Sequence, residues 1–260
     1  MNILFVTIAW PEKGERNLYS DLIDEFVRNG HEVFVLCAEA DGPGCPPVKE
    51  NEINVLRVPT LQIRKVKKIS KAIALFSLGS KMFRSALKNW SGLRIDLIIG
   101  HSPPVTLSGL YRRLKSWYNS PVYYLLKDIW PHGPADLGLI QRNGIIFRFF
   151  RYHEVRMYKI ADYIGCMSEM NVDYIIRENR YLNPEKVEVC PNTISPRALE
   201  IKEDVKGIRN RHNIPENATV FIFSGNLGKA HGLDFYINVI ESLKDYERAF
   251  FLIGGSGLYY

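Results

Sequence analysis

The 260-residue sequence has the composition of an ordinary globular protein, with 46% hydrophobic and 24% charged residues. Its length allows one large domain or two small ones, and it contains no low-complexity tract or repeat. No apolar run approaches the roughly 18 residues that cross a bilayer, and the first residues lack the basic start of a signal peptide. The four cysteines show no CxxC or zinc spacing, so we expect buried thiols in a reducing, cytosolic compartment.

The net charge of +6 comes from one block of the chain. Residues 60–94 contain nine basic residues and no acidic ones, whereas the remainder has 25 basic against 28 acidic residues. The block also has a helical order, with mostly apolar positions at steps of three and four. These positions are Val66, Ile69, Ile73, Phe76, Ser80, Phe83, Leu87 and Trp90. We expect this stripe to pack on a core and the cations to attract anionic lipid or a lipid diphosphate; no nucleic-acid-binding motif accompanies them.

The first 190 residues alternate short apolar runs with amphipathic stretches. Residues 16–29 place Leu18, Leu22 and Phe26 at helical spacing, and Gly30 follows where a helix end favours positive φ. The expected strands are Asn2–Ile8, Glu32–Cys37, Val55–Val58, Leu97–Gly100, Val122–Leu126, Tyr163–Met167 and Val187–Cys190. Strands joined by helix-length crossovers predict a parallel sheet covered on both faces, so residues 1–190 form a Rossmann-like α/β domain.

Residues 191–204 contain proline and asparagine with weak periodicity, which predicts an interdomain linker. A helix over Lys206–His212, a strand over Thr219–Ser224, a helix over Leu233–Lys244 and a strand over Ala249–Ile253 are expected next. They make one βαβ unit, followed by a glycine-rich turn that is typical of the start of another helix. We therefore expect residues 205–260 to be an incomplete second Rossmann-like domain.

Open parallel sheets bind ligands outside the carboxyl ends of their strands, so the residues after each strand are the candidates. Trp130 offers a face for stacking on a sugar ring, and Asp128 can accept paired sugar hydroxyls. We predict catalytic or sugar-orienting roles for Asp128 and His101, and acceptor contacts for Lys127, Trp130 and His132. The structural alternative is that Trp130 closes the sheet end, Asp128 caps the next turn and His101 braces its own turn.

A glycine-rich run also joins a strand to a helix near the carboxyl terminus. Gly225 and Gly232 let the backbone approach a ligand, and Lys229 adds a charge, which suits a diphosphate at a helix N-terminus. Asn226 belongs to the same run, and Gly14 lies in a similar turn after the first strand. Neither a Walker A loop nor GxGxxG is present, which argues against ATP and NAD enzymes. The sequence has no metal cluster or Ser/His/Asp nucleophile elbow.

Several segments together resemble family 4 glycosyltransferases of the GT-B fold, especially the bacterial enzymes of O-antigen and capsule synthesis. Each segment is modestly specific, and their order and spacing make the set strong. The segments are residues 2–8 with Pro11 and Gly14, Asn29–Val33, Asp96–Pro104, Lys127–Pro131 with Gly138 and Leu139, Ala161–Ile164 leading to Ser168, Val189–Asn192 and Ser224–Gly232.

The resemblance implies two Rossmann-like domains and retaining transfer of a sugar from a nucleotide diphosphate sugar to a polyprenyl-diphosphate-linked or other saccharide acceptor. It implies no cofactor and no metal, and a location on the inner face of the plasma membrane. Gly14 would lie beside the donor phosphates, and the loop from Gly225 to Gly232 would bind them. Asn192 matches the asparagine of the family's Pro-Asn-Gly linker, and Ser168 and Asn192 would lie at the interdomain region.

The sequence also departs from the family pattern. Thr193 replaces the linker glycine, Asn226 replaces an arginine and His231 replaces a lysine, so Lys229 would supply the cation. The family's Glu-x7-Glu motif would lie beyond Tyr260, which predicts a chain truncated in the second domain and inactive alone. One alternative is a non-catalytic, membrane-associated binding subunit or pseudoenzyme partner; another, weaker one is a sugar-nucleotide epimerase.

Overall fold

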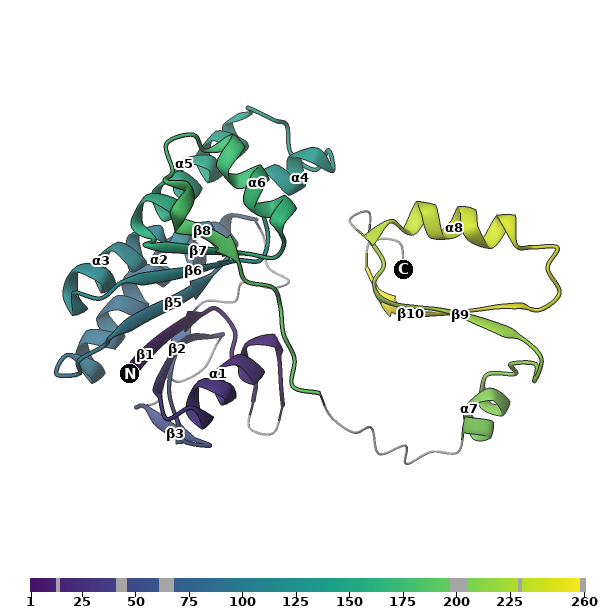
Figure 1. Ribbon diagram of the computed structural model, residues 1–260, viewed down its shortest axis with the longest axis horizontal. Helices are drawn as coiled ribbons and strands as arrows, with labels where there is room; N and C mark the ends of the chain where they lie inside the picture. The colour runs from purple at the N-terminus through teal and green to yellow at the C-terminus, as the bar shows by residue number, and fades with distance from the viewer. Residues whose placement is uncertain (13–14, 41–45, 61–67, 197–204, 229–230, 258–260) are drawn as a thin grey trace. The chain divides into compact units, whose positions relative to one another are not determined.

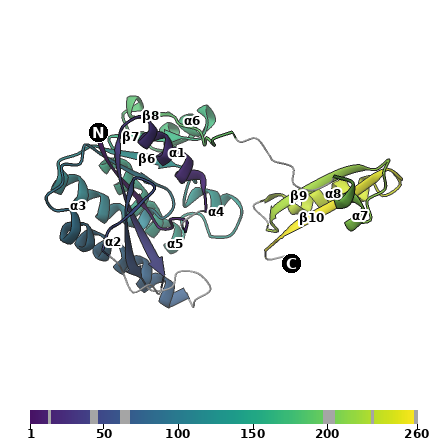
Figure 2. The same cartoon turned by 90° about the horizontal axis from the view of Figure 1, so that it is seen from below.

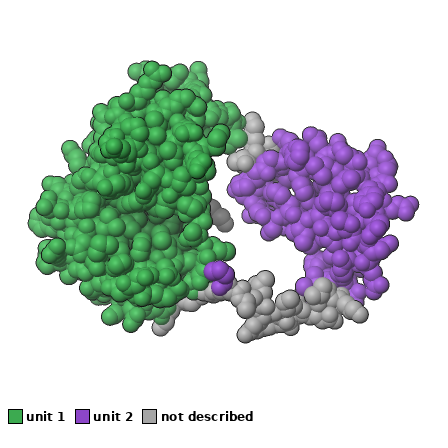
Figure 3. All heavy atoms as spheres, in the orientation of Figure 1, with its two compact units in different colours: residues 1–195 green, residues 196–260 purple. Residues whose placement is uncertain are grey.

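The computed structural model describes residues 1–12, 15–40, 46–60, 68–196, 205–228 and 231–257. The chain divides into two compact units, Met1–Ser195 and Pro196–Tyr260 (Figure 3). Gly14 and Lys229, both predicted to bind the donor, lie outside the described residues, as does the start of the basic block up to Lys67. Among the helices that the structure describes, none is long and apolar enough to span a membrane.

Unit 1 is built on an eight-stranded sheet with the order β3-β4-β2-β1-β5-β6-β7-β8 (Figure 1). Its strands are β1 (Asn2–Thr7), β2 (Glu32–Ala40), β3 (Val48–Glu50), β4 (Ile53–Thr60), β5 (Leu97–His101), β6 (Val122–Leu126), β7 (Tyr163–Cys166) and β8 (Val187–Val189). Neighbouring strands are parallel except for β3, which runs antiparallel to β4. The parallel α/β sheet predicted from the sequence is confirmed. The sequence analysis missed β3, because its three residues are too short for a periodic signal.

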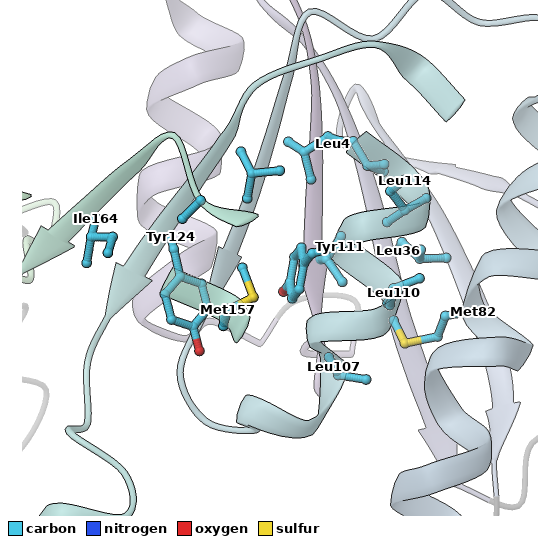
Figure 4. Close-up of a cluster of buried hydrophobic side chains, with 14 of the residues drawn as sticks. Leu4, Leu36, Met82, Leu107, Leu110, Tyr111, Leu114, Tyr124, Met157 and Ile164 are labelled. Atoms are coloured by element: carbon cyan, nitrogen blue, oxygen red, sulfur yellow. The ribbon is translucent and has the colours of Figure 1, made fainter. Parts of the chain in front are cut away.

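Helices cover both faces of this sheet. One face packs on α1 (Leu18–Arg28), whose Asn17 cap accepts hydrogen bonds from the backbone of Tyr19 and Ser20. The other face packs on four helices, α2 (Lys68–Trp90), α3 (Ser108–Tyr118), α5 (Ile145–Ile160) and α6 (Glu169–Glu178). Figure 4 shows Leu4 and Leu36 of the strands facing Leu110 and Met82 of the helices. The remaining helical pieces are α4 (His132–Asp136) and the 3₁₀ turns η1 (Val105–Leu107) and η2 (Pro184–Lys186).

Helix α2 forms where the apolar stripe predicted it, but the buried face differs from that stripe. The residues packed into the core are Leu78, Met82, Ala86 and Trp90. Phe83 and Leu87 of the predicted stripe are only partly buried. The predicted stripe was therefore wrong by about one residue over this part of the helix. The core face includes the small residue Ala86, which adds little to an apolar pattern.

Two aspartates join the amino-terminal ends of neighbouring strands in the same way. Asp96 precedes β5, and its carboxylate accepts a hydrogen bond of 2.8 Å from the backbone N–H of Asn2 in β1. Asp162 precedes β7, and its carboxylate accepts a hydrogen bond of 2.8 Å from the backbone N–H of Val122 in β6. In each pair the aspartate N–H also donates to the partner's carbonyl at 2.8 Å. Lys115 of α3 forms an ion pair of 2.6 Å with Asp162. Asp162 belongs to the Ala161–Ile164 segment that resembles family 4 glycosyltransferases, and its contacts here link neighbouring strands of the sheet.

The chain beyond β8 stays attached to unit 1 for several residues. The N–H of Ser195 donates a hydrogen bond of 3.0 Å to the carboxylate of Asp21 in α1. Arg16 also pairs with Asp21, and these two contacts lower the pKa of that carboxyl group. The division between the units falls after Ser195, within residues 191–204, the stretch predicted from the sequence as an interdomain linker. We call residues 190–195 the exit segment.

Unit 2 consists of α7 (Val205–Arg211), β9 (Thr219–Asn226), α8 (Leu233–Ser242) and β10 (Ala249–Ser256). Strands β9 and β10 pair in parallel from Thr219 to Asn226, and α8 connects them (Figures 1 and 2). Tyr236 of α8 holds the helix on the sheet, with its ring 5.3 Å from that of Phe223 and 6.1 Å from that of Phe251. The βαβ arrangement is the one expected from the sequence.

Candidate functional site

The two halves of the unit 1 sheet meet between β1 and β5. From β1 the chain adds β2 and β4 on one side, and then β5 to β8 on the other. Such a reversal leaves a crevice outside the carboxyl ends of the two central strands, where open α/β sheets bind ligands. Thr7 ends β1 and His101 ends β5. The sequence prediction of a site after strand ends therefore points to this edge.

His101 is 7% exposed and lies within the sheet end. Its Nε2 atom is hydrogen-bonded to Thr7 Oγ1 at 3.0 Å, and its ring stacks on Tyr19 with centroids 4.4 Å apart. Burial is the main cause that lowers the pKa of the imidazole to about 4; the hydrogen bond with the Ser102 carbonyl opposes this shift, and the charge of Lys127 adds to it. The ring is therefore neutral at physiological pH. Its contacts fit a residue that positions Thr7 and Tyr19; direct contact with a sugar stays a prediction.

Ser102 holds the loop that carries Lys127 and Asp128, a role the sequence analysis did not assign to it. Its hydroxyl accepts hydrogen bonds from the backbone N–H groups of Lys127 at 2.9 Å and Asp128 at 3.0 Å. The same hydroxyl donates to the carbonyl of Asp128 at 3.0 Å. Because Ser102 is fully buried, these bonds are protected from water. A serine directly after a strand-end histidine was the available signal, but its partners lie 25 residues further along the chain.

A pocket of about 290 Å³ opens beside this loop. Its walls come from Leu18, Tyr19 and Leu22 of α1, from the end of β6, and from residues 189–193. Most of the lining is apolar, and its polar residues include Lys127, Asn192 and Thr193. Two predicted site residues from separate parts of the sequence thus lie on one pocket.

Lys127 is half-buried, and burial lowers the pKa of its ammonium group. The nearby Cys190 thiol opposes this effect as a smaller contribution. Among the described residues the Lys127 ammonium has no hydrogen-bond or ion-pair partner. A desolvated cation without a counterion favours an anionic ligand, because the ligand would restore the lost interactions.

Asp128 follows Lys127 and is exposed. Its negative charge acts on Tyr19: burial, and secondly the Asp128 carboxylate, raise the pKa of this phenol to about 12. The two residues are therefore electrostatic neighbours, and Tyr19 stays protonated as a hydrogen-bond donor. A carboxylate beside a phenol and an ammonium group provides acceptors and donors for a polyhydroxylated ligand.

Trp130 and His132 lie away from this pocket, in contact with α5. The Trp130 ring meets Phe150 edge-on with centroids 5.2 Å apart. His132 is 5% exposed, and its Nδ1 atom lies 3.8 Å from the Glu154 carboxylate. Burial, and then the charge of Arg151, lower the pKa of His132. Both side chains contribute to packing here, and their predicted acceptor contacts stay predictions.

Ser168 and Asn192 were both predicted to lie in the interdomain region. Ser168 caps α6, and its hydroxyl accepts a hydrogen bond from the N–H of Asn171. Asn192 belongs to the exit segment and is exposed at the pocket rim. Ser168 thus has a local structural role, whereas Asn192 is available to a ligand of unit 1.

Unit 2 has a second, open pocket of about 630 Å³ at the carboxyl ends of β9 and β10. Gly225 and Asn226 line it on one side, and Gly254 to Gly257 on the other. A Cβ atom on Gly255 would lie 1.9 Å from the Gly225 carbonyl oxygen, so this close backbone approach requires glycine. Gly232 has φ +66° and starts α8. Of the predicted donor residues, Gly225 and Asn226 thus meet at one pocket.

The described residues contain no group of three or more histidine, cysteine, aspartate or glutamate side chains arranged to hold a metal ion. Among the described cysteines, Cys37 and Cys166 are buried and Cys190 is half-buried, and all three are free. Cys45 lies outside the described residues.

These sites belong to a recognisable class of protein. Residues 16–197 match the model of Glycosyltransferase Family 4, which is more than half of the chain. The protein is therefore a member of glycosyltransferase family 4, as the resemblance predicted.

Two bacterial proteins share parts of the sequence. Probable glycosyltransferase WbjE of Pseudomonas aeruginosa is 25% identical over 170 residues, covering 64% of this chain and 41% of WbjE. WcaI of Escherichia coli K12, named as a colanic acid biosynthesis glycosyl transferase, is 33% identical over 54 residues, or 21% of this chain and 13% of WcaI. The chain thus spans well under two thirds of either relative.

Solved structures share the fold across the whole chain. The E. coli structure of trehalose-6-phosphate bound with UDP-2-fluoro glucose aligns with a TM-score of 0.69 and 13% identity, covering 99% of this chain and 65% of that one. HepE of Anabaena, in complex with UDP and glucose, aligns with a TM-score of 0.52 and 15% identity, covering 98% and 69%. At such identities the likeness shows the fold alone, and it confirms the predicted GT-B fold class.

Proposed function

We propose that the chain supplies the acceptor domain and part of the nucleotide-sugar domain of a retaining glycosyltransferase of surface polysaccharide synthesis. Its acceptor would be a saccharide on a polyprenyl diphosphate, as in O-antigen or capsule assembly. The observation that carries the proposal is the unit 1 pocket, which has apolar walls and the Lys127 ammonium group, without a hydrogen-bond or ion-pair partner in the part of the chain that the structure describes. Membership of family 4 and the names of WbjE and WcaI support the reaction class.

The acceptor's anionic or sugar portion would enter the pocket beside Lys127 and Asn192. Lys127 would pair with the anionic group, and Asp128 would accept hydrogen bonds from sugar hydroxyls. Tyr19 would donate from its protonated hydroxyl. His101 would act through Thr7 and Tyr19, which it contacts, and thereby orient the sugar rather than exchange a proton at neutral pH. This division of roles follows from burial and charge at each side chain.

The donor would be a nucleotide diphosphate sugar bound by unit 2. Backbone N–H groups near Gly225 and Gly232 would stabilise the leaving diphosphate, because preorganised dipoles need no rearrangement as charge develops. Lys229 is proposed as the accompanying cation. The UDP-sugar complexes of the structural neighbours support a nucleotide sugar as the donor class. The proposal includes neither a cofactor nor a metal ion.

The proposed location is the inner face of the plasma membrane, where polyprenyl-linked saccharides are accessible to cytosolic nucleotide sugars. The cation-rich block of residues 60–94 supports attraction to anionic lipid. The proposal includes no nucleic-acid partner.

Turnover is the direct test. The protein would be incubated with a panel of UDP- and GDP-sugars and with polyprenyl-diphosphate-linked saccharides from bacterial membranes. Released nucleoside diphosphate and the mass of the lipid product would be measured, and the anomeric configuration would be read by NMR. Retention of configuration is expected. Saturable binding of the lipid saccharide without nucleoside diphosphate release would instead favour the non-catalytic binding subunit.

The role of the pocket is tested separately with Lys127→Ala. We expect an increase of about tenfold or more in the acceptor's KM or Kd, since a charge-assisted contact is lost, with a smaller change for the donor. Lys49→Ala is the matched control, because Lys49 is an exposed lysine on β3 at the other edge of the sheet. Equal acceptor affinity in the two variants would contradict the assignment of this pocket.

A further inference from the structure

Helix α5 exposes large apolar side chains at its amino-terminal half. Ile145 is 88% exposed, Ile146 is 60% exposed and Tyr152 is 57% exposed. Leu139, in the segment leading to the helix, is 58% exposed. Single exposed apolar residues are ordinary, but several on one short element mark an interaction surface.

Ile145 and Tyr152 occupy the outward side of the helix, and Ile146 lies at the margin of that side, about 100° around the helix from Ile145. With 3.6 residues per turn, Ile145, Tyr152 and Arg156 fall on one line along α5, flanked by Arg148 and Lys159. The opposite side is centred on Glu154, which is completely buried, and includes the core residues Met157 and Tyr158. The outward face is therefore not required for the unit 1 core, and Figure 1 shows α5 on the helical layer of the sheet.

The solvent-facing charges of residues 137–160 are all positive. Between residues 137 and 160 the chain contains five basic residues and a single acidic one, Glu154. Glu154 is paired inside the protein with Arg151 at 2.6 Å and accepts from the Tyr158 hydroxyl at 2.8 Å. The guanidinium group of Arg156 lies 5.3 Å over the Tyr152 ring and donates to its hydroxyl at 3.0 Å. The outward face therefore combines apolar groups with cations and carries no carboxylate.

We infer that this face of α5, formed by Ile145, Ile146, Arg148, Tyr152 and Arg156, lies on an anionic lipid bilayer. The isoleucines enter the boundary between headgroups and acyl chains, and the arginines pair with lipid phosphates. A second copy of the chain is the less suitable occupant, because a two-fold contact through this face would bring arginines against arginines. The membrane has the complementary charge.

The inference rests on the proposed function in one respect: a contact with the membrane would bring the protein to its lipid-linked acceptor. It assigns the membrane contact to α5, whereas the sequence pattern pointed to the basic block of α2. The test contains no nucleotide sugar or acceptor, so its outcome is independent of whether turnover is found.

The experiment is co-sedimentation of the protein with vesicles of phosphatidylcholine alone or mixed with phosphatidylglycerol. We expect binding to the mixed vesicles to exceed binding to the neutral ones. In Ile145→Ser with Ile146→Ser, partitioning should fall by about tenfold or more, because two exposed isoleucines lose their burial in lipid. Arg148→Glu should weaken binding to the anionic vesicles only. Since all three residues are exposed, circular dichroism and thermal unfolding should match the parent protein.

Matched controls on β3 are Val48→Ser and Lys49→Glu, which change one exposed apolar and one exposed basic residue at the far edge of the sheet. Both should bind like the parent. A third comparison, Arg84→Glu with Lys88→Glu on α2, separates the two basic surfaces. Loss of binding in this variant with full binding in the α5 variants would overturn the inference.

Sedimentation velocity without lipid completes the test. We expect the Ile145→Ser, Ile146→Ser variant and the parent to have the same mass in solution. A parent dimer that the variant abolishes would identify the face as a self-association surface and would also overturn the inference, as would equal binding to neutral and anionic vesicles.

Discussion

At the scale of single residues, the hydroxyl of Ser102 holds together the loop on which the candidate site depends. It accepts from two backbone N–H groups and donates to one carbonyl, all in the loop of Lys127 and Asp128. A hydroxyl has one donor and two acceptor positions, so its capacity is completely used. The geometry of the Lys127 side chain therefore depends on a residue that does not line the pocket.

Ser102→Ala should destabilise unit 1 by about 1–3 kcal/mol, because two partly buried backbone N–H groups and one carbonyl lose their partner. Urea unfolding followed by tryptophan fluorescence measures this, since all four tryptophans lie in unit 1. Ser85→Ala on α2 is the control and should change stability by no more than about 0.5 kcal/mol. If both variants unfold at the same urea concentration, Ser102 does not support the loop.

His101 gives unit 1 a pH dependence. Burial lowers the pKa of the folded imidazole to about 4, from an ordinary value of 6.5. Between these values the unfolded chain binds a proton that the folded chain excludes, so stability is fully present above pH 6.5 and falls as the pH drops toward 4. The loss over this window should reach about 3 kcal/mol.

Removing the imidazole tests this dependence. In His101→Asn the difference in urea stability between pH 7.5 and pH 4.5 should shrink by that amount. His212→Asn is the control, because His212 lies in unit 2 and its replacement should not affect tryptophan-monitored unfolding of unit 1. An unchanged pH dependence in His101→Asn would mean that the folded imidazole titrates normally.

At the scale of elements, α2 shows what an apolar pattern predicts and what it misses. The 3.6-residue period correctly predicted a helix ending at Trp90. Over residues 78–90 the core face consists of Leu78, Met82, Ala86 and Trp90, and the predicted stripe contained only Trp90 of these. Phe83 packs against the core while only partly buried, and the Arg113 guanidinium lies 5.0 Å from its ring centroid. Which face is buried depends on contacts with another helix, and the local sequence does not contain them.

The two faces of α2 should differ in mutational cost. Met82→Ala removes a completely buried side chain and should cost about 2–5 kcal/mol. Leu87→Ala removes a partly exposed side chain from the predicted stripe and should cost only about 1 kcal/mol. Equilibrium unfolding of both variants compares them directly, and a larger loss for Leu87→Ala would restore the predicted face.

At the scale of the whole molecule, the sequence predicted the parallel sheet, whereas the roles of the candidate site residues stay predictions. The alternation of strands and helical crossovers in the sequence correctly predicted a parallel sheet. The predicted strand Val122–Leu126 has the same bounds as β6. Of the predicted site residues, Lys127 and Asn192 share a pocket, and their roles stay predictions. Trp130 and His132 instead pack on α5, because their partners Phe150 and Glu154 come from a helix whose position the sequence did not reveal.

The two units should differ in stability. Within the described part of unit 2, the buried hydrophobic side chains are Ile214, Leu227 and Leu233, whereas Ile222 and Phe235 are largely exposed. Two strands and a helix bury too little apolar surface for strong independent stability. Hydrogen exchange followed by mass spectrometry should therefore show β9 and β10 exchanging at lower urea concentrations than β1 and β5. Simultaneous exchange of all four strands would show a single cooperative unit.

The exit segment forms part of the wall of the unit 1 pocket, and Ser195 fastens its far end to α1. Whatever fills the pocket therefore touches the stretch of chain through which unit 1 continues into unit 2. By thermodynamic reciprocity, a ligand that restricts Pro191 and Thr193 gains affinity whenever that stretch is restrained by other means. Ligand binding in the pocket and the conformation of the exit segment should therefore be thermodynamically coupled.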